Sequence, residues 1–273
     1  MPDCRPIGVF DSGLGGLSVV KELIYTLPGE DIIYFGDTGR VPYGTRSFET
    51  IEKYARQDEA FLLQKNVKLI IAACGTVSAV APHTGRELSV PFIEVVSPAA
   101  KAAVKSTRSG RIGVIGTTAT IKSDSYTKCM KSLMPEVQVI ANDCPIFVPL
   151  VEAGWIDRDD IVTVETAKRY LKPMIDGNVD TLILGCTHYP VIKDIISDIM
   201  GDGVTLINTG EQAANSAASY LKENDMLGNK SNDGLKYFFV SDRTDSFSHT
   251  ASILLGSDIT SSVERVDIDC IGG

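Results

Sequence analysis

Two cysteines of this 273-residue chain occupy matching sequence contexts. Cys74 and Cys186 each follow a run of apolar residues, and a threonine comes one or two positions after each of them. A free cysteine at a strand end is more often a plain core residue, but a matched pair favours a chemical role. A thiol at a helix N-terminus has a lowered pKa, so we expect both thiols to titrate closer to neutrality and to exchange protons there.

Two such thiols on opposite sides of one substrate would suit the inversion of a carbon acid. One thiolate removes a proton from one face while the other thiol delivers a proton to the opposite face, and the roles exchange in reverse. His188, two residues after Cys186, could polarise that thiol or act on the substrate. A lone histidine is usually structural, but this Cys-Thr-His run favours a function.

A glycine-rich loop, Asp11–Gly16, follows the first apolar run. It does not match the dinucleotide-binding fingerprint, because Ser18 stands where that pattern requires its third glycine. The glycines could instead let backbone N–H groups approach a carboxylate at the start of a helix. Asp11 could hold a substrate ammonium group or tune Cys74, and capping the helix is an equally good explanation.

Short apolar runs alternate with helical patterns along the chain, which is typical of α/β proteins. We expect strands at Ile7–Phe10, Ile32–Gly36, Leu69–Ala73, Phe92–Val95, Ile112–Gly116, Val137–Ala141, Thr181–Gly185, Thr205–Asn208 and Tyr237–Ser241. We expect helices at Gly16–Thr26, Phe48–Lys65, Ile161–Asp176 and Glu211–Glu223. The polar stretch 222–234 predicts a surface loop. Ligands of parallel α/β sheets bind at the carboxyl ends of the strands, where both cysteine motifs fall.

The two halves of the sequence resemble each other. The apolar run at Ile7 and its small-residue loop recur at Ile112, and the run before Cys74 recurs before Cys186 at a similar spacing. We therefore predict two similar, doubly wound α/β domains with mainly parallel sheets and an active site in the cleft between them.

The predicted first domain comprises residues 1–97 and 208–273, and the predicted second domain comprises residues 98–207. The first boundary falls before a proline, which favours an extended linker. Cys74 belongs to the first domain and Cys186 to the second, so a cleft between the domains would bring the two thiols to one substrate.

Composition and charge exclude several classes of function. The formal charge of −9 argues against nucleic-acid binding and against an anionic membrane surface. No apolar stretch is long enough to span a bilayer, and the N-terminal residues do not form a secretion signal. Six dispersed cysteines without a CxxC pair are typical of reduced thiols, so we expect a cytoplasmic protein.

These segments together resemble the glutamate racemases, cofactor-independent enzymes that supply D-glutamate for peptidoglycan in the bacterial cell wall. The matching blocks are Gly8–Gly16, Asp37–Gly44, Cys74–Thr76, Gly116–Thr120, Leu150–Gly154 and Gly185–Pro190. The blocks occur in the expected order, and with the strand pattern the resemblance covers nearly the whole chain. The first and last blocks are the most specific.

The resemblance implies that Cys74 removes the α-proton of D-glutamate and Cys186 that of L-glutamate. It implies catalytic support from Asp11, Asp37, Glu152 and His188. It implies substrate contacts from Asp11, Ser12, Tyr43, Gly44, Gly75, Thr76, Thr117, Thr120, Thr187 and His188. It also implies a homodimer that needs no cofactor and no metal. One departure is Gly75, where the family usually has asparagine, so a neighbouring group or water must replace the side-chain amide.

Three alternatives remain open at this point. A racemase of aspartate or of hydantoins would share the two thiols, although the Gly185–Pro190 block favours glutamate. A thiol redox or zinc protein could use Cys74, Cys186 and His188, but no short-spaced ligand pair supports it. A non-catalytic binding protein would not need both thiols. Assays with glutamate and aspartate discriminate among these alternatives.

Overall fold

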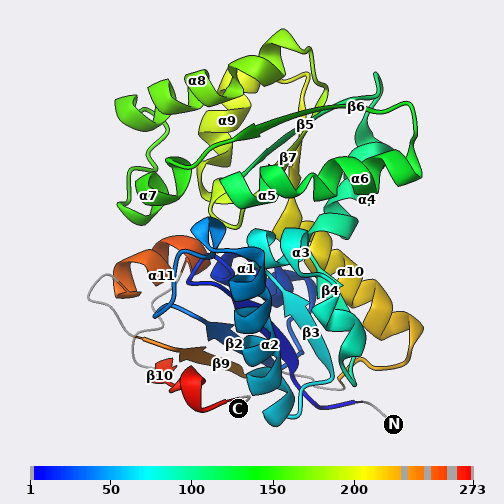
Figure 1. The fold of residues 1–273 in the computed structure, drawn as a ribbon, viewed down its shortest axis with the longest axis vertical. Helices are drawn as coiled ribbons and strands as arrows, with labels where there is room; N and C mark the ends of the chain where they lie inside the picture. The colour runs from blue at the N-terminus through cyan, green and yellow to red at the C-terminus, as the bar shows by residue number, and fades with distance from the viewer. Residues whose placement is uncertain (1–2, 229–232, 243–246, 257–262, 272–273) are drawn as a thin grey trace.

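The computed structural model describes residues 3–228, 233–242, 247–256 and 263–271. Two α/β halves are stacked on each other, each built on its own sheet (Figure 1). Every strand pairing in the described residues is parallel. The prediction of an α/β fold with parallel sheets is therefore confirmed.

The first sheet has six strands in the order β10-β9-β2-β1-β3-β4. Their bounds are β1 Ile7–Asp11, β2 Ile32–Gly36, β3 Leu69–Ala72, β4 Phe92–Glu94, β9 Lys236–Val240 and β10 Val263–Arg265. The second sheet has four strands in the order β6-β5-β7-β8. Their bounds are β5 Arg111–Gly116, β6 Gln138–Asp143, β7 Thr181–Gly185 and β8 Thr205–Asn208. The order β2-β1-β3-β4 thus has the same pattern as β6-β5-β7-β8, which matches the internal resemblance of the sequence.

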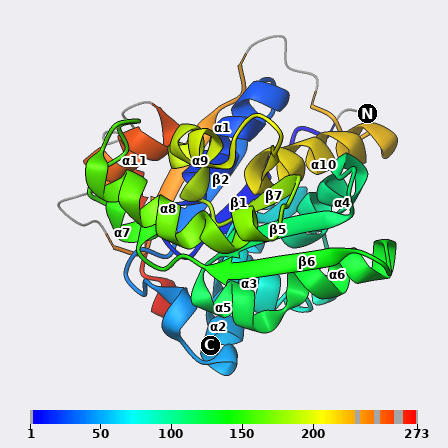
Figure 2. The ribbon, with the colours of Figure 1, turned by 90° about the horizontal axis from the view of Figure 1, so that it is seen from above.

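Helices cover both faces of each sheet, as Figures 1 and 2 show. The α-helices are α1 Leu17–Thr26, α2 Phe48–Gln64, α3 Gly75–Val80, α4 Val96–Ser106, α5 Thr118–Ser123, α6 Ser125–Leu133, α7 Phe147–Glu152, α8 Ile161–Asp176, α9 Lys193–Met200, α10 Thr209–Glu223 and α11 Phe247–Leu255. Short 3₁₀ helices are η1 Tyr43–Thr45, η2 Thr84–Glu87, η3 Tyr189–Ile192 and η5 Ile268–Cys270. None of the helices in the described part of the chain is long and apolar enough to cross a membrane.

The central strands β1 and β7 are buried on both faces because helices pack on both sides of them. In β1, Val9 belongs to the core shared with α1, whereas the next residue, Phe10, belongs to the core shared with α2. The same alternation occurs in β7, where Leu182 faces the α8 side and Ile183 faces the α4 side. Successive residues of one apolar strand therefore pack against opposite layers of helices, and each sheet lies between two helical layers.

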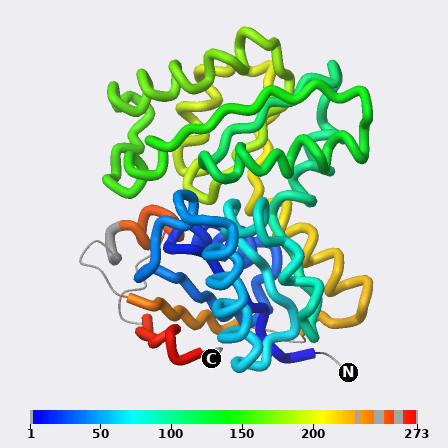
Figure 3. Tube along the Cα trace, viewed as in Figure 1, coloured from blue at the N-terminus to red at the C-terminus, as the bar shows by residue number. Residues whose placement is uncertain are grey.

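The chain passes between the halves twice, as the trace in Figure 3 shows. After β4 it enters the second half through α4, which packs on α6, β7 and β8, and after β8 it returns through α10, which packs on α1. The predicted strands and long helices are all present, with ends shifted by one or two residues. The predicted loop at 222–234 begins at the end of α10, and its residues 229–232 lie outside the described residues.

Candidate active site

A cavity of about 350 Å³ lies at the carboxyl ends of both sheets, with walls from both halves. The loops after β1, β2 and β3 line it from one side, and those after β5, β6 and β7 from the other. The predicted site residues that line it are Asp11, Ser12, Tyr43, Gly44, Cys74, Gly75, Thr76, Thr117, Glu152, Cys186, Thr187 and His188. Asp37 and Thr120 lie outside the lining. Cys74 after β3 and Cys186 after β7 thus place their thiols in one cavity.

Cys74 is 4% exposed and occupies the N-cap position of α3. Its thiol donates a hydrogen bond to Ser12 Oγ at 3.3 Å. Burial and the charge of Asp11 raise the pKa of Cys74 to about 12, so the expectation of a lowered pKa is wrong for this thiol. The reason is that α3 has only six residues, and its dipole cannot offset burial beside a carboxylate. Cys74 is therefore a protonated thiol before substrate binds.

Cys186 is 7% exposed and precedes the short 3₁₀ helix η3, not an α-helix. Its Sγ lies 3.9 Å from His188 Nδ1, and His188 Nε2 lies 3.1 Å from Glu152 Oε1. Burial lowers the pKa of His188, but the hydrogen bonds with Cys186 and Glu152 outweigh this and raise the pKa to about 10. A sulfur, an imidazolium and a carboxylate thus form a chain that ends at Glu152.

Asp11 brings a buried carboxylate to the same cavity. Its Oδ2 accepts a hydrogen bond from the Gly13 N–H at 3.1 Å, and the N-cap position of α1 is Gly16. Burial raises the pKa of Asp11, whereas the charge of His188 opposes that rise. Asp11 from the first half and His188 from the second therefore influence each other across the cavity.

The two halves touch closely around the thiols. Thr76 Oγ1 lies 3.3 Å from Thr117 Oγ1 across the cleft. Thr117 Oγ1 also lies 2.9 Å from Thr120 Oγ1. A Cβ at Gly75 would lie 2.8 Å from the Gly185 carbonyl oxygen. Gly75 therefore allows the two halves to approach each other closely, and a residue with a Cβ at this position must displace the backbone at Gly185.

Asp37 takes a different place from the one expected. Its carboxylate binds Arg40 at 2.6 Å and accepts a hydrogen bond from the Tyr43 hydroxyl, and it does not line the cavity. The Tyr43 hydroxyl also lies 3.0 Å from Asp58 Oδ2. Asp58 was not predicted as a site residue, although an acidic residue on the buried face of the predicted helix 48–65 was an available signal.

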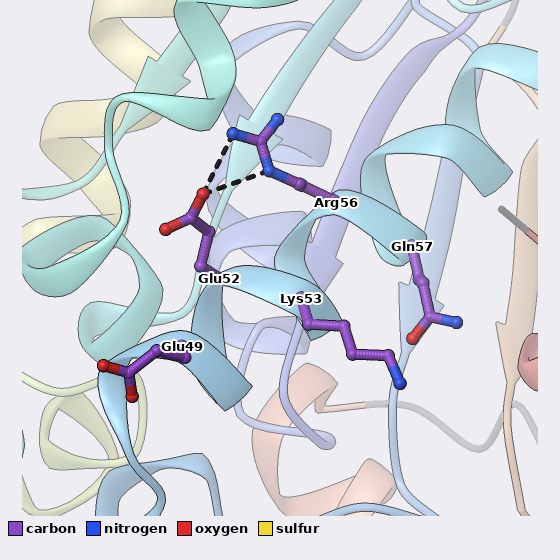
Figure 4. Close-up of a pocket in the computed structure, with 5 residues that line it drawn as sticks. All are labelled: Glu49, Glu52, Lys53, Arg56 and Gln57. Carbon is purple, nitrogen blue, oxygen red and sulfur yellow. Dashed lines mark hydrogen bonds and ion pairs between the residues drawn. The ribbon is translucent and has the colours of Figure 1, made fainter. Parts of the chain in front are cut away.

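Other features of the surface do not compete with this cavity. A hollow on the outer face of α2 is lined by Glu49, Glu52, Lys53, Arg56 and Gln57, with Arg56 paired to Glu52 (Figure 4). All of its residues come from one helix, and it contains neither thiol. Among the described residues, no group of three or more His, Cys, Asp or Glu side chains could hold a metal ion, so the zinc alternative lacks its cluster.

The chain is similar to known proteins in both sequence and structure. The family model described as Asp/Glu/hydantoin racemase matches residues 7–217. The glutamate racemase of Geobacter metallireducens is 45% identical over 93% of this chain and 94% of that protein. The crystal structure of glutamate racemase from Francisella tularensis with D-glutamate has a TM-score of 0.90 at 40% identity, covering 98% of this chain and 99% of that one.

Two further structures extend the comparison. The glutamate racemase of Thermus thermophilus, in complex with β-chloro-D-alanine, has a TM-score of 0.87 at 38% identity and covers 98% of this chain and 99% of that one. An aspartate racemase homologue from Pyrococcus horikoshii is 17% identical, with a TM-score of 0.57 over 79% of this chain and 99% of that one. At that identity the likeness concerns the fold alone.

Proposed function

Since this chain belongs to the Asp/Glu/hydantoin racemase family, we propose that it interconverts L- and D-glutamate by two-base proton transfer. The observation that carries the proposal is one cavity lined by Cys74 and Cys186 from opposite halves, each with its own polar partner. The product D-glutamate would serve peptidoglycan biosynthesis. The proposal includes the cytoplasmic location and the homodimer that the resemblance implies.

The proposed reaction from the L-isomer begins at Cys186. Its thiolate removes the α-proton, and the electron pair of the broken C–H bond delocalises into the α-carboxylate. Cys74 then delivers its thiol proton to the opposite face, and D-glutamate forms. The resulting enzyme has a protonated Cys186 and an ionised Cys74, which is the starting state for the reverse reaction.

The surroundings of the thiols support these starting states. A protonated His188 beside Cys186 stabilises negative charge on that sulfur, and the hydrogen bonds of His188 with Cys186 and Glu152 raise its pKa and keep it protonated. The raised pKa of Cys74 keeps its proton available for donation. Asp11 is suited to hold the substrate ammonium group, whose positive charge would offset the developing thiolate at Cys74.

We assign the substrate carboxylates to backbone N–H groups and hydroxyls around the cavity. The assigned groups come from Ser12, Gly44, Gly75, Thr76, Thr117 and Thr187. Thr120 supports Thr117 from behind, and Tyr43 stands in the cavity wall. In this assignment Gly75 contributes its N–H without a side chain.

The domain boundaries form part of the proposal as well. The described strands of the first sheet lie at 7–94 and 236–265, and those of the second sheet lie at 111–208. This supports a first domain of residues 1–97 and 208–273 and a second domain of residues 98–207, except that Asn208 is the last residue of β8 in the second sheet.

The protein should racemise glutamate, without added cofactor, far better than aspartate. Aspartate is one methylene shorter and would leave buried donors unpaired, at a cost of about 1–3 kcal/mol each. Circular dichroism of each amino acid, after dialysis of the protein against a chelator, measures both properties. Similar kcat/KM values for the two amino acids, or activity that a metal or pyridoxal phosphate restores, would contradict the proposal.

A further inference from the structure

A buried pair of carboxyl groups lies behind the wall of the cavity. Asp37 follows β2 and Asp58 lies on α2; both are fully buried, and neither lines the cavity. The hydroxyl of Tyr43 lies between them, within hydrogen-bond distance of Asp37 Oδ2 and 3.0 Å from Asp58 Oδ2. Tyr43 itself lines the cavity, so this pair supports a residue that faces the substrate site.

The contacts of the Tyr43 hydroxyl require an additional proton. A phenol has a single O–H donor, so Tyr43 can donate to only one of the two carboxyl groups. With both groups ionised, the other contact would place two lone pairs against each other. With one group protonated, its O–H donates to the Tyr43 oxygen, and the Tyr43 O–H donates to the remaining carboxylate.

The charges around the pair lead to the same conclusion. Arg40 is the cation that the described part of the chain brings into contact with both carboxyl groups, through Nε to Asp37 at 2.6 Å and Nη2 to Asp58 at 3.3 Å. The other titratable groups nearby are Tyr34 on β2, Tyr54 beneath Arg40, Glu59 next along α2, and Asp269 at 3.8 Å from Arg40; none of them adds positive charge. One guanidinium cannot compensate two fully buried carboxylates, so one of them stays neutral.

Asp58 is the better candidate for the neutral group. Arg40 lies closer to Asp37 and stabilises its ionised form. Burial raises the pKa of Asp58 well above its usual range, and the charge of Asp37 adds to this effect. The hydrogen bonds then run in one direction, from Asp58 to Tyr43 and from Tyr43 to Asp37.

We propose that Asp58 is a positioning residue whose protonated carboxyl group holds Tyr43, and with it the cavity-lining segment 41–45, against the substrate. Asp58 itself does not touch the substrate. The predicted effect of Asp58 on kinetics rests on the proposed function, since that effect is measured through glutamate racemisation. The protonation state of Asp58 is measured independently of activity.

Two variants separate the neutral acid from an ordinary buried charge. Asp58→Asn keeps the shape and a neutral donor and acceptor, so KM and kcat for both enantiomers should stay within about threefold of the wild type. Asp58→Ala leaves Tyr43 without its donor and should raise KM for both enantiomers by about tenfold or more, with a smaller change in kcat. Glu59→Gln is the matched control, because this buried neighbour is hydrogen-bonded to Thr84 instead of Tyr43, and its KM should not change.

Carbon-13 NMR of protein labelled at the aspartate carboxyl groups tests the proton directly. We expect one neutral-acid signal at pH 7 that is absent from Asp58→Asn, and this comparison suffices if Asp58→Ala does not fold. The proposal is overturned if Asp58→Asn raises KM as much as Asp58→Ala, or if no neutral-acid signal of the wild type at pH 7 is lost in Asp58→Asn. If the wild type does not racemise glutamate, the proposed function fails, and the neutral-acid signal still decides whether Asp58 is protonated.

Discussion

Serine in place of Cys74 or Cys186 is expected to slow glutamate racemisation by about 10²–10⁴-fold in either case. A hydroxyl is far less acidic than a thiol, so the variant lacks one of the two proton-transfer groups near neutral pH. Circular dichroism with each enantiomer measures the loss. Because racemisation has an equilibrium constant of one, kcat/KM must stay equal for the two enantiomers, and a difference between the thiols has to be read from another reaction.

Elimination from 3-chloroglutamate provides that reaction. Removal of the α-proton expels chloride, and the enamine that forms hydrolyses to 2-oxoglutarate and ammonium, so the opposite acid is not needed. Cys74→Ser should eliminate preferentially from the L-configured compound, which Cys186 attacks, and Cys186→Ser from the D-configured compound. Measurement of 2-oxoglutarate from each isomer gives the preference.

The control for thiol loss is Cys129→Ser. Cys129 is partly buried outside the cavity, whereas Cys144 is fully buried, and serine at position 144 could destabilise the fold. Cys129→Ser should racemise glutamate at the wild-type rate. A shared enantiomer preference in the two active-site variants, or near wild-type racemisation by either one, would show that the two-base assignment is wrong.

His188→Gln is expected to lower kcat/KM for both enantiomers by about 10²-fold or more, through loss of the cation beside Cys186. Elimination from L-configured 3-chloroglutamate should fall more than elimination from the D-configured isomer, because Cys186 acts on the L face. His83 lies outside the cavity, so His83→Gln is the matched control and should leave both reactions unchanged. Equal losses in the two eliminations would contradict the assignment of His188 to Cys186.

The charge of His188 should depend on Glu152. In the folded protein the pKa of His188 is raised from 6.5 to about 10. The stability that protonated His188 gives to the folded protein is therefore fully present below pH 6.5 and is lost as pH rises toward about 10. Glu152→Gln should move that loss to lower pH. The chain has three histidines, so imidazole NMR can follow the His188 signal, and an unchanged titration in the variant would exclude Glu152 as its partner.

The sequence predicted those parts of the site that depend on single strands and their ends. Repeated apolar runs located both thiols, and the Cys-Thr-His run located His188. β10 was missed because its three residues, Val263–Arg265, include only one apolar side chain. Glu152 was identified by resemblance alone, since its distance from His188 depends on how α7 packs.

Electrostatic properties were harder to predict from sequence than positions. The lowered pKa expected for Cys74 rested on its place at a helix N-terminus, but α3 is short and the thiol is buried beside Asp11. Asp37 was expected near the thiols, yet its carboxylate is bound by Arg40 and by the Tyr43 hydroxyl. These properties arise from contacts between distant segments, which local sequence patterns do not encode.

Racemisation of L-glutamate in deuterium oxide tests the two-thiol mechanism most directly. Cys186 removes the α-hydrogen, and Cys74 delivers a solvent-derived deuteron from the other side. In the first turnovers, D-glutamate should therefore carry deuterium at the α-carbon while the remaining L-glutamate keeps hydrogen, which mass spectrometry after chiral separation resolves. Equal early deuterium content in both enantiomers, or D-glutamate that retains the original hydrogen, would mean that a single base serves both faces.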